Sequence, residues 1–213
     1  MKTNRRDWMC AAGAGLALSR KARAITAGSP NPLLELFAQR QSVRQYKPDP
    51  IPAEHLRLIL DAARRAPTAM NQQPWKFLVI CDREKILRMK QRVIELTVKT
   101  NDPAARQKAI ASLDGYFSAP VYVVVLTDNQ CISPEFAKHD GPLAAGYLML
   151  AARALGYGTV YIAGTIPESV TREVLNISAR YTRVCITPLG IPDGWPPPRP
   201  KKKLEDLVAY ESL

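Results

Sequence analysis

The stretch that decides the fold runs from Ala66 to Ile80 and reads APTAMNQQPWKFLVI. Pro67 cannot continue a helix, so it predicts that the preceding helix ends at Ala66. Polar residues then predict a loop, and the apolar run that closes the stretch predicts a buried strand. Polar residues between a helix end and a central strand suit a ligand-binding loop, in which Asn71 offers both a donor and an acceptor. An ordinary helix-to-strand connection is the alternative.

The segment before this loop predicts a helix that begins at Pro52 and runs to about Ala66. Its apolar residues recur at helical spacing, and His55 falls on the opposite, polar face. We therefore expect the His55 side chain to be exposed. The apolar stripe consists of Leu56, Ile59, Leu60 and Ala63.

Upstream of that helix, residues 32–40 predict a helix that delivers Arg40 to a short extended segment. In an extended chain Arg40, Ser42 and Arg44 share one face, because side chains alternate. Two guanidinium groups flanking a hydroxyl form a plausible cradle for an anion. Solvated surface arginines are the alternative.

The composition is that of a globular domain. The chain has 213 residues, of which 46% are hydrophobic and 23% charged. Its net charge is +11, and removing the six basic residues and one acid of residues 1–24 (6 − 1 = 5) leaves +6. Outside residues 199–203 the basic residues are dispersed, which argues against a nucleic-acid interface and favours a phosphate-bearing cofactor for that cluster.

Four cysteines occur without a CxxC pair, so the sequence indicates neither a zinc site nor a dithiol, and no other metal-ligand cluster is found. Cys81 and Cys185 end or lie in apolar runs, and we expect both to be small buried residues.

Residues 1–24 read MKTNRRDWMCAAGAGLALSRKARA. The Arg5–Arg6 pair before a short apolar run resembles a twin-arginine export signal, with possible cleavage after Ala24. The run is too short for a stable membrane anchor. A basic tail is the alternative, and residues 25–32 are interpreted as a linker.

The helix expected over Gly141–Leu155 is apolar on all sides, which predicts full burial. His139–Asp140 precedes it and is more typical of a helix start than of an acid–base pair. The remaining expected elements are strands at 75–81, 121–126, 159–162 and 184–189, helices at 83–97 and from 167, and a loop with a helix at 101–118.

The ordered set of motifs resembles the nitroreductase family of FMN enzymes over 33–213. The family combines a basic Arg/His/Ser cluster, a DLxxILxAARxAP helix and an Asn-x-Gln-Pro-Trp loop, which residues 40–52, 56–67 and 71–75 match in order. The resemblance implies an α+β fold, with a mixed, mostly antiparallel sheet flanked by helices. It also implies an entwined homodimer with FMN at the subunit interface, a dimer contact through 141–155, and a C-terminal extension from Leu204 that wraps the partner.

The resemblance further implies the residues that hold FMN. Arg40, Ser42, Lys201 and Lys203 would bind the phosphate and ribityl chain, with Gln41 standing where many relatives have a basic residue. Arg44 would lie near the pyrimidine edge of the ring, and Ala163–Gly164 near its reactive nitrogen. The partner subunit would contribute the loop after the second helix. The full set is Arg40, Gln41, Ser42, Arg44, Pro67, Thr68, Ala69, Asn71, Ala163, Gly164, Lys201 and Lys203.

The implied activity is reduction of nitroaromatic, quinone or similar acceptors, with NAD(P)H as the donor in vitro. The flavin carries the chemistry, so no catalytic side chain is assigned. Two alternatives stay open: an FMN enzyme of different chemistry, such as a dehydrogenase or a flavin-cleaving enzyme, and a non-enzymatic flavin-binding protein. Export would place the protein outside the cytoplasm, where another redox partner would have to supply the electrons.

Overall fold

A computed structural model describes residues 31–212. The expected export signal (1–24) and nearly all of the expected linker (25–32) lie outside the described residues. The helices are α1 (Pro32–Gln39), α2 (Ala53–Ala63), α3 (Arg83–Thr97), α4 (Pro103–Asp114), α5 (Pro134–Ala154) and α6 (Glu168–Leu175). The strands are β1 (Trp75–Ile80), β2 (Val121–Asp128), β3 (Gly158–Thr159) and β4 (Tyr181–Gly190), and short 3-10 turns occur at η2 (Ala69–Asn71), η3 (Gly115–Phe117) and η4 (Leu204–Asp206).

The four strands form one sheet in the order β1-β2-β4-β3, and each neighbouring pair is antiparallel. A single parallel bridge joins Ser42 to Thr159 at its edge. The expected α+β fold with a mixed, mostly antiparallel sheet is therefore confirmed.

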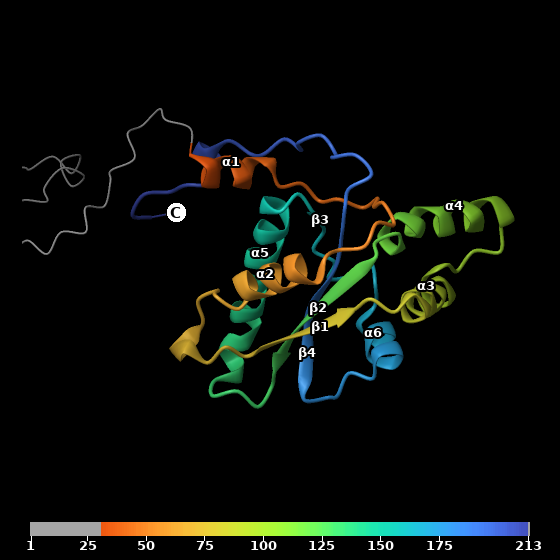
Figure 1. The fold of residues 1–213 in the computed structure, drawn as a ribbon, viewed down its shortest axis with the longest axis horizontal. Coiled ribbons are helices and arrows are strands. Elements are labelled where there is room, and N and C mark those ends of the chain that lie inside the picture. The colour runs from red at the N-terminus through yellow and green to blue at the C-terminus, as the bar shows by residue number, and fades with distance from the viewer. Residues whose placement is uncertain (1–30, 213) are drawn as a thin grey trace, which may run out of the picture. The chain divides into compact units, whose positions relative to one another are not determined.

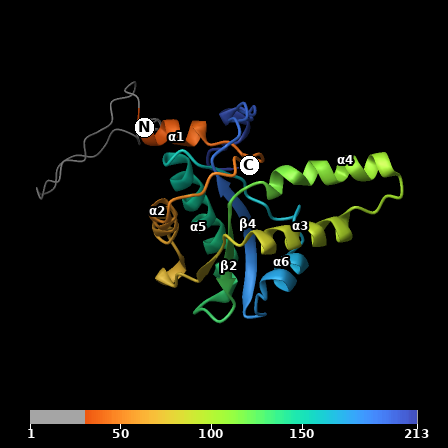
Figure 2. The same cartoon turned by 45° about the vertical axis from the view of Figure 1, so that its right-hand side comes forward.

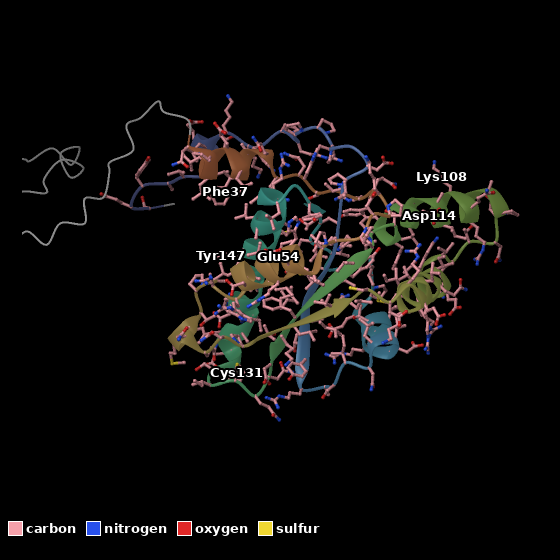
Figure 3. The ribbon with its side chains drawn as sticks, viewed as in Figure 1. Phe37, Glu54, Lys108, Asp114, Cys131 and Tyr147 are labelled. Atoms are coloured by element: carbon pink, nitrogen blue, oxygen red, sulfur yellow. The ribbon has the colours of Figure 1, made fainter. Side chains whose placement is uncertain are left out.

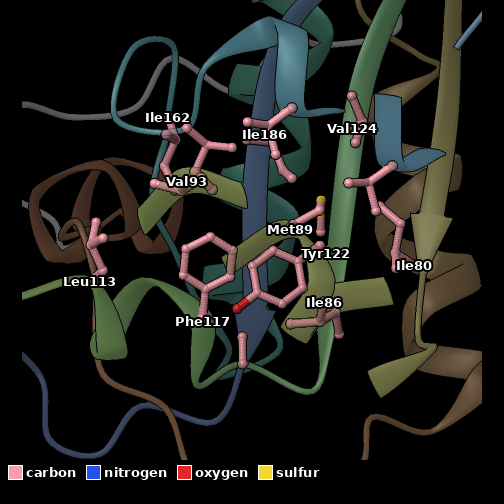
Figure 4. Close-up of a cluster of buried hydrophobic side chains, with 14 of the residues drawn as sticks. Ile80, Ile86, Met89, Val93, Leu113, Phe117, Tyr122, Val124, Ile162 and Ile186 are labelled. Carbon is pink, nitrogen blue, oxygen red and sulfur yellow. The ribbon is translucent and has the colours of Figure 1, made fainter. Parts of the chain in front are cut away.

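Helices cover both faces of the sheet, which explains why β2 is apolar at nearly every position. Val121, Val123 and Val125 face a core formed with α2 and α5, whereas Tyr122 and Val124 face α3 and α6. Figures 1 and 2 show α2 and α5 on one side of the strands and α3 and α6 on the other. Figure 4 shows the second core, in which the rings of Phe117 and Tyr122 lie 6.2 Å apart between centroids.

The helix expected over Gly141–Leu155 begins earlier than predicted, and within the protomer it is not fully buried. The helix begins at Pro134, so His139 and Asp140 lie inside it, and Pro142 occupies an interior position on its exposed side. Leu143 and Tyr147 are 44% and 43% exposed within the protomer. The apolar composition of the helix thus leaves one apolar face uncovered by the rest of this chain.

The structure also corrects three smaller expectations. The strand expected at 159–162 is reduced to β3 and a separate bridge at Ile162, because the chain leaves the sheet between them. Cys81 is exposed, since it follows the last residue of β1 at the sheet edge, whereas Cys185 is buried as predicted. His55 is half-buried, because its Nδ1 lies 2.8 Å from the hydroxyl of Tyr157.

Most other elements lie where the sequence predicted them. The segment at 101–118 forms α4 and η3, and α4 is capped by Asp102, whose carboxylate accepts the backbone N–H groups of Ala104 and Ala105. No helix within residues 31–212 has both the length and the apolar character that a bilayer crossing requires.

Candidate functional site

A cavity of about 290 Å³ brings together residues from two distant parts of the chain. The segment after α1 forms one wall and the proline-rich segment after β4 forms the other. Five of the residues predicted to hold FMN line this cavity together. Its lining consists of Arg40, Gln41, Ser42, Arg44, Pro196, Pro197, Arg199 and Lys201.

The first wall is held against the edge of the sheet. The backbone N–H of Val43 donates to the carbonyl of Thr159 at 3.0 Å, and the Val43 side chain is buried. A Cβ at Gly158 would lie 2.7 Å from Val43, so only glycine permits this close approach. Because side chains alternate along an extended segment, burying Val43 leaves Ser42 and Arg44 facing the cavity.

Arg44 is oriented by the segment that follows α4. Its Nε donates to the Tyr116 hydroxyl at 2.9 Å, and its guanidinium lies 5.8 Å from the centre of the Tyr116 ring. Gly115 permits this arrangement, since a Cβ there would lie 2.3 Å from the Arg44 carbonyl oxygen. The Nη1 of Arg44 also donates to the backbone carbonyl of Ser42 at 3.1 Å, so the remaining N–H groups of the guanidinium stay available to a ligand.

The cavity is strongly cationic. Four of its lining side chains carry a positive charge and none is acidic. A phosphate monoester carries about −1.5 to −2 charges at neutral pH and accepts several hydrogen bonds, which guanidinium groups match in geometry. The donor set therefore fits the phosphate end of a nucleotide-like cofactor.

The loop after α2 lies elsewhere in the protomer. Pro67, Thr68, Ala69 and Asn71 do not line the cavity. Their loop is tied to α5 by the buried carboxylate of Asp140, which accepts the Ala69 N–H at 3.1 Å and the Gln72 amide at 2.8 Å.

The backbone of this loop is strained. Met70, Asn71 and Gln73 have φ values of 50°, 53° and 47°, in the left-handed region that residues other than glycine seldom adopt. Backbone strain of this kind persists only where surrounding contacts over-determine it, and it is concentrated at binding sites. Asp140 supplies two such contacts from α5.

The cavity and the loop contact α5 far apart along its length. Arg153, in its last turn, donates to the side chain of Gln39 beside the cavity at 3.1 Å, whereas Asp140 holds the loop. Thirteen residues separate the two contacts (153 − 140 = 13), which corresponds to about 20 Å along a helix.

Ala163 and Gly164 lie in an exposed turn between β3 and α6. Arg183 braces this turn, because its guanidinium donates to the carbonyls of Ala163 at 2.8 Å and Ile166 at 2.7 Å. The register of β2 and β4 shifts beside Arg183, and such bulges commonly re-aim a side chain. Burial lowers the pKa of Arg183.

Three residues beside the cavity or the loop were not among those predicted to hold FMN: Arg199, Tyr116 and Asp140. Lys203 is exposed and does not line the cavity, whereas Arg199 does. The alternation of Arg199 and Lys201 after three prolines was the available signal. Nothing in the sequence connects Asp140 to Ala69 or Tyr116 to Arg44, since each pair is about 70 residues apart.

Comparison with known proteins gives a consistent result. The model of the "Nitroreductase family" matches residues 37–191. The chain is 30% identical to an iodotyrosine deiodinase of Thermotoga neapolitana, covering 85% of this chain and 98% of that protein. It is 32% identical to an NADH dehydrogenase of Thermus thermophilus, covering 74% and 86%.

A solved structure shares the same fold and carries FMN. It is the FMN complex of a candidate nitroreductase from Desulfovibrio desulfuricans, with 25% identity and a TM-score of 0.69. The match covers 87% of this chain and 99% of that one. With the family match spanning more than half of the sequence, these similarities establish that the chain belongs to the nitroreductase family.

Proposed function

We propose that the protein is an FMN-dependent oxidoreductase that reduces nitroaromatic, quinone or similar acceptors, with NAD(P)H as its donor in vitro. The observation that carries the proposal is the cationic cavity, which gathers Arg40, Ser42, Arg44, Arg199 and Lys201. Members of the family that bind FMN support the identity of the cofactor.

The size of the cavity agrees with the phosphate and ribityl end of FMN. A volume of about 290 Å³ lies at the lower end of small-molecule sites, so the ring of FMN must extend beyond the cavity. The first wall leads to β3 through the Ser42–Thr159 bridge, and four residues further on lies the turn at Ala163. The side chains present therefore fit FMN, and an added adenylate would need a further opening beyond the phosphate.

FMN, when bound, supplies hydride transfer between a donor and an acceptor. The cations of the cavity would hold and neutralise its phosphate. By the family resemblance Arg44 would lie near the pyrimidine edge, where a fixed positive charge would stabilise negative charge that develops on reduction. Tyr116 keeps the guanidinium of Arg44 in place. The exposed backbone of Ala163 and Gly164, braced by Arg183, can approach an aromatic ring closely.

We also propose that the functional unit is a homodimer. The loop at 67–71 and the cavity contact α5 about 20 Å apart, which favours a flavin ring that receives the loop from the partner rather than from the same protomer. Two α5 helices packed antiparallel would place the loop of one protomer beside the cavity of its partner. Leu143 and Tyr147 expose apolar surface on α5, and a Cβ at Gly146 would contact nothing within 4 Å, which leaves this face available to a partner. Figure 3 shows Tyr147 and Phe37 on the side away from α3 and α4.

An absorbance spectrum of the purified protein, followed by anaerobic titration with NADH and NADPH, tests the proposal. We expect a bound flavin that is released as FMN on denaturation and is bleached by a nicotinamide donor. Product analysis with a nitroaromatic, a quinone and 3-iodo-L-tyrosine then identifies the acceptor class, because one relative is an iodotyrosine deiodinase. Absence of flavin would refute the proposal, and a flavin that no donor reduces would favour a non-enzymatic flavin-binding protein.

A further inference from the structure

The two walls of the cavity are joined by backbone hydrogen bonds at one end only. Lys47 N–H donates to the Ile191 carbonyl at 2.9 Å, and Asp193 N–H donates to the Gln45 carbonyl at 3.0 Å. Within the described chain, no backbone hydrogen bond connects residues 194–201 to the first wall. The part of the second wall that carries the cations therefore depends on side chains for its position.

One guanidinium contacts both walls. Arg153, in the last turn of α5, donates from Nη2 to the Gln39 side chain at 3.1 Å, next to Arg40. The same guanidinium lies 3.9 Å from the centre of the Trp195 ring, at the start of the second wall. Its Nε is buried and has no hydrogen-bond partner. Arg153 does not line the cavity, so its contacts act on the walls rather than on a ligand.

The segment beyond Trp195 is stiff. Pro196, Pro197 and Pro198 each restrict φ to about −65°, and consecutive prolines favour an extended polyproline conformation. The residue before Trp195 is Gly194, whose φ of 90° marks a turn. A stiff segment that follows a turn has its direction set by the contact nearest to the turn, which here is the Arg153–Trp195 stack. That direction determines where Arg199 and Lys201 lie.

We propose that Arg153 and Trp195 form a clamp that positions the cations of the second wall and so sets the affinity of the site for the phosphate group of FMN. Both are positioning residues. The inference rests on the proposed function and deepens it. In this proposal the clamp allows the site to discriminate FMN from riboflavin, which lacks the phosphate.

The test compares the two flavins on the full chain after removal of its own flavin. Trp195→Leu removes the aromatic face and leaves every charge of the site in place. We expect its dissociation constant for FMN, measured by flavin fluorescence quenching, to rise about tenfold, while that for riboflavin changes by less than about twofold. A general loss of folding would weaken the binding of both flavins alike.

Two further variants separate geometry from charge. Arg153→Lys keeps the positive charge but loses the planar group that stacks on Trp195, so we expect it to behave like Trp195→Leu. Trp195→Phe retains an aromatic face and should restore most of the FMN affinity. Tyr181→Leu is the matched control, since Tyr181 lies 5.6 Å under Arg180 in a similar pair away from the cavity. It should leave the ratio of the two affinities unchanged.

The outcomes are distinguishable from failure of the proposed function. Wild-type FMN affinity in Trp195→Leu, or an equal loss of FMN and riboflavin binding, would overturn the clamp. If the wild type binds neither flavin, the proposed function fails and inorganic pyrophosphate becomes the probe. Calorimetry should then show weaker pyrophosphate binding in Trp195→Leu than in the wild type if the clamp acts, and equal binding would overturn it.

Discussion

Asp140, buried in α5, accepts a hydrogen bond from the side-chain amide of Gln72 in the loop after α2, with 2.8 Å between Oδ2 and Nε2. The Gln72 side chain also contacts Ser133 through both its amide nitrogen and its oxygen, at 3.2 and 2.9 Å. A buried carboxylate is costly unless it is hydrogen-bonded, so this loop and α5 stabilise each other. The strained backbone at Met70 and Asn71 depends on this contact.

Replacing Asp140 should therefore lower both the stability of the protein and its flavin content. For Asp140→Ala we expect the free energy of unfolding to fall by about 1–3 kcal/mol, because the Ala69 N–H and the Gln72 amide lose a charged acceptor. Urea unfolding and the flavin content of the purified protein are the measurements. Asp61→Ala is the control, since Asp61 pairs with Arg64 and Arg65 at the surface and should cost less than about 1 kcal/mol. Unchanged flavin content in Asp140→Ala would contradict a role for the loop at the site.

Arg199 and Lys203 offer a matched comparison, because each alanine variant removes one positive charge. Arg199 lines the cavity and Lys203 does not. Loss of a charged hydrogen bond of about 1.5–3 kcal/mol corresponds to roughly 10- to 100-fold weaker FMN binding for Arg199→Ala. Lys203→Ala should change affinity by less than about threefold, because its charge lies outside the cavity lining and is screened by salt. The reverse order would favour the role of Lys203 that the family resemblance implied.

Tyr116→Phe tests the placement of Arg44 with the loss of one oxygen atom. The hydroxyl accepts a hydrogen bond from Arg44 Nε at 2.9 Å, and without it the guanidinium can move away from the ring of FMN. A weaker positive field disfavours the reduced flavin, so we expect the two-electron potential to fall by about 10–30 mV. Spectroelectrochemistry measures the shift. Tyr210→Phe, at an 86% exposed tyrosine, should leave the potential unchanged. A potential equal to that of the wild type in Tyr116→Phe would argue against the role of Arg44.

Two glycines of α5 separate protomer stability from dimer formation. A Cβ at Gly146 meets nothing within 4 Å, so Gly146→Leu should fold as well as the wild type. In a dimer packed through this face the leucine would prevent close approach, and light scattering should report a monomer with little flavin. At Gly141 a Cβ would lie 2.4 Å from Val184, so Gly141→Ala should instead lower the free energy of unfolding by about 1–3 kcal/mol. A flavin-loaded dimer of Gly146→Leu would refute this interface.

Export is a separate proposal that rests on the Arg5–Arg6 pair, the short apolar run after it and the cleavage position after Ala24. The twin-arginine route carries folded proteins, so FMN bound in the cytoplasm could travel with the chain. Outside the cytoplasm nicotinamide donors are scarce, and the electrons would then come from another redox partner. Fractionation should find the wild type outside the inner membrane without its first 24 or so residues, and an Arg5→Lys, Arg6→Lys variant inside and uncut. A wild type that stays cytoplasmic and uncut would identify these residues as a basic tail and NAD(P)H as the natural donor.

Features that depend on neighbouring residues were predictable from the sequence. The bounds of α3 were predicted correctly, because Asp82 caps its first turn and its apolar residues follow the helical period. The unbroken apolar run at 121–126 predicted a strand, and β2 (Val121–Asp128) contains it. Because side chains alternate along an extended chain, the sequence predicted that Arg40, Ser42 and Arg44 share one face. All three line one cavity.

Features that depend on distant residues were decided only by the tertiary structure. His139–Asp140 has the sequence pattern of a helix start, yet α5 begins at Pro134 and buries Asp140 against the loop after α2. Arg199 and Lys203 are both basic residues of the same C-terminal segment, and the sequence does not distinguish them. The direction of the second wall in the folded protein places Arg199 at the cavity. Helix caps and hydrophobic periodicity involve residues only a few positions apart, so they can be predicted from the sequence. The contact of Asp140 with the loop after α2, and the position of Arg199 at the cavity, arise only when elements far apart in the chain pack together.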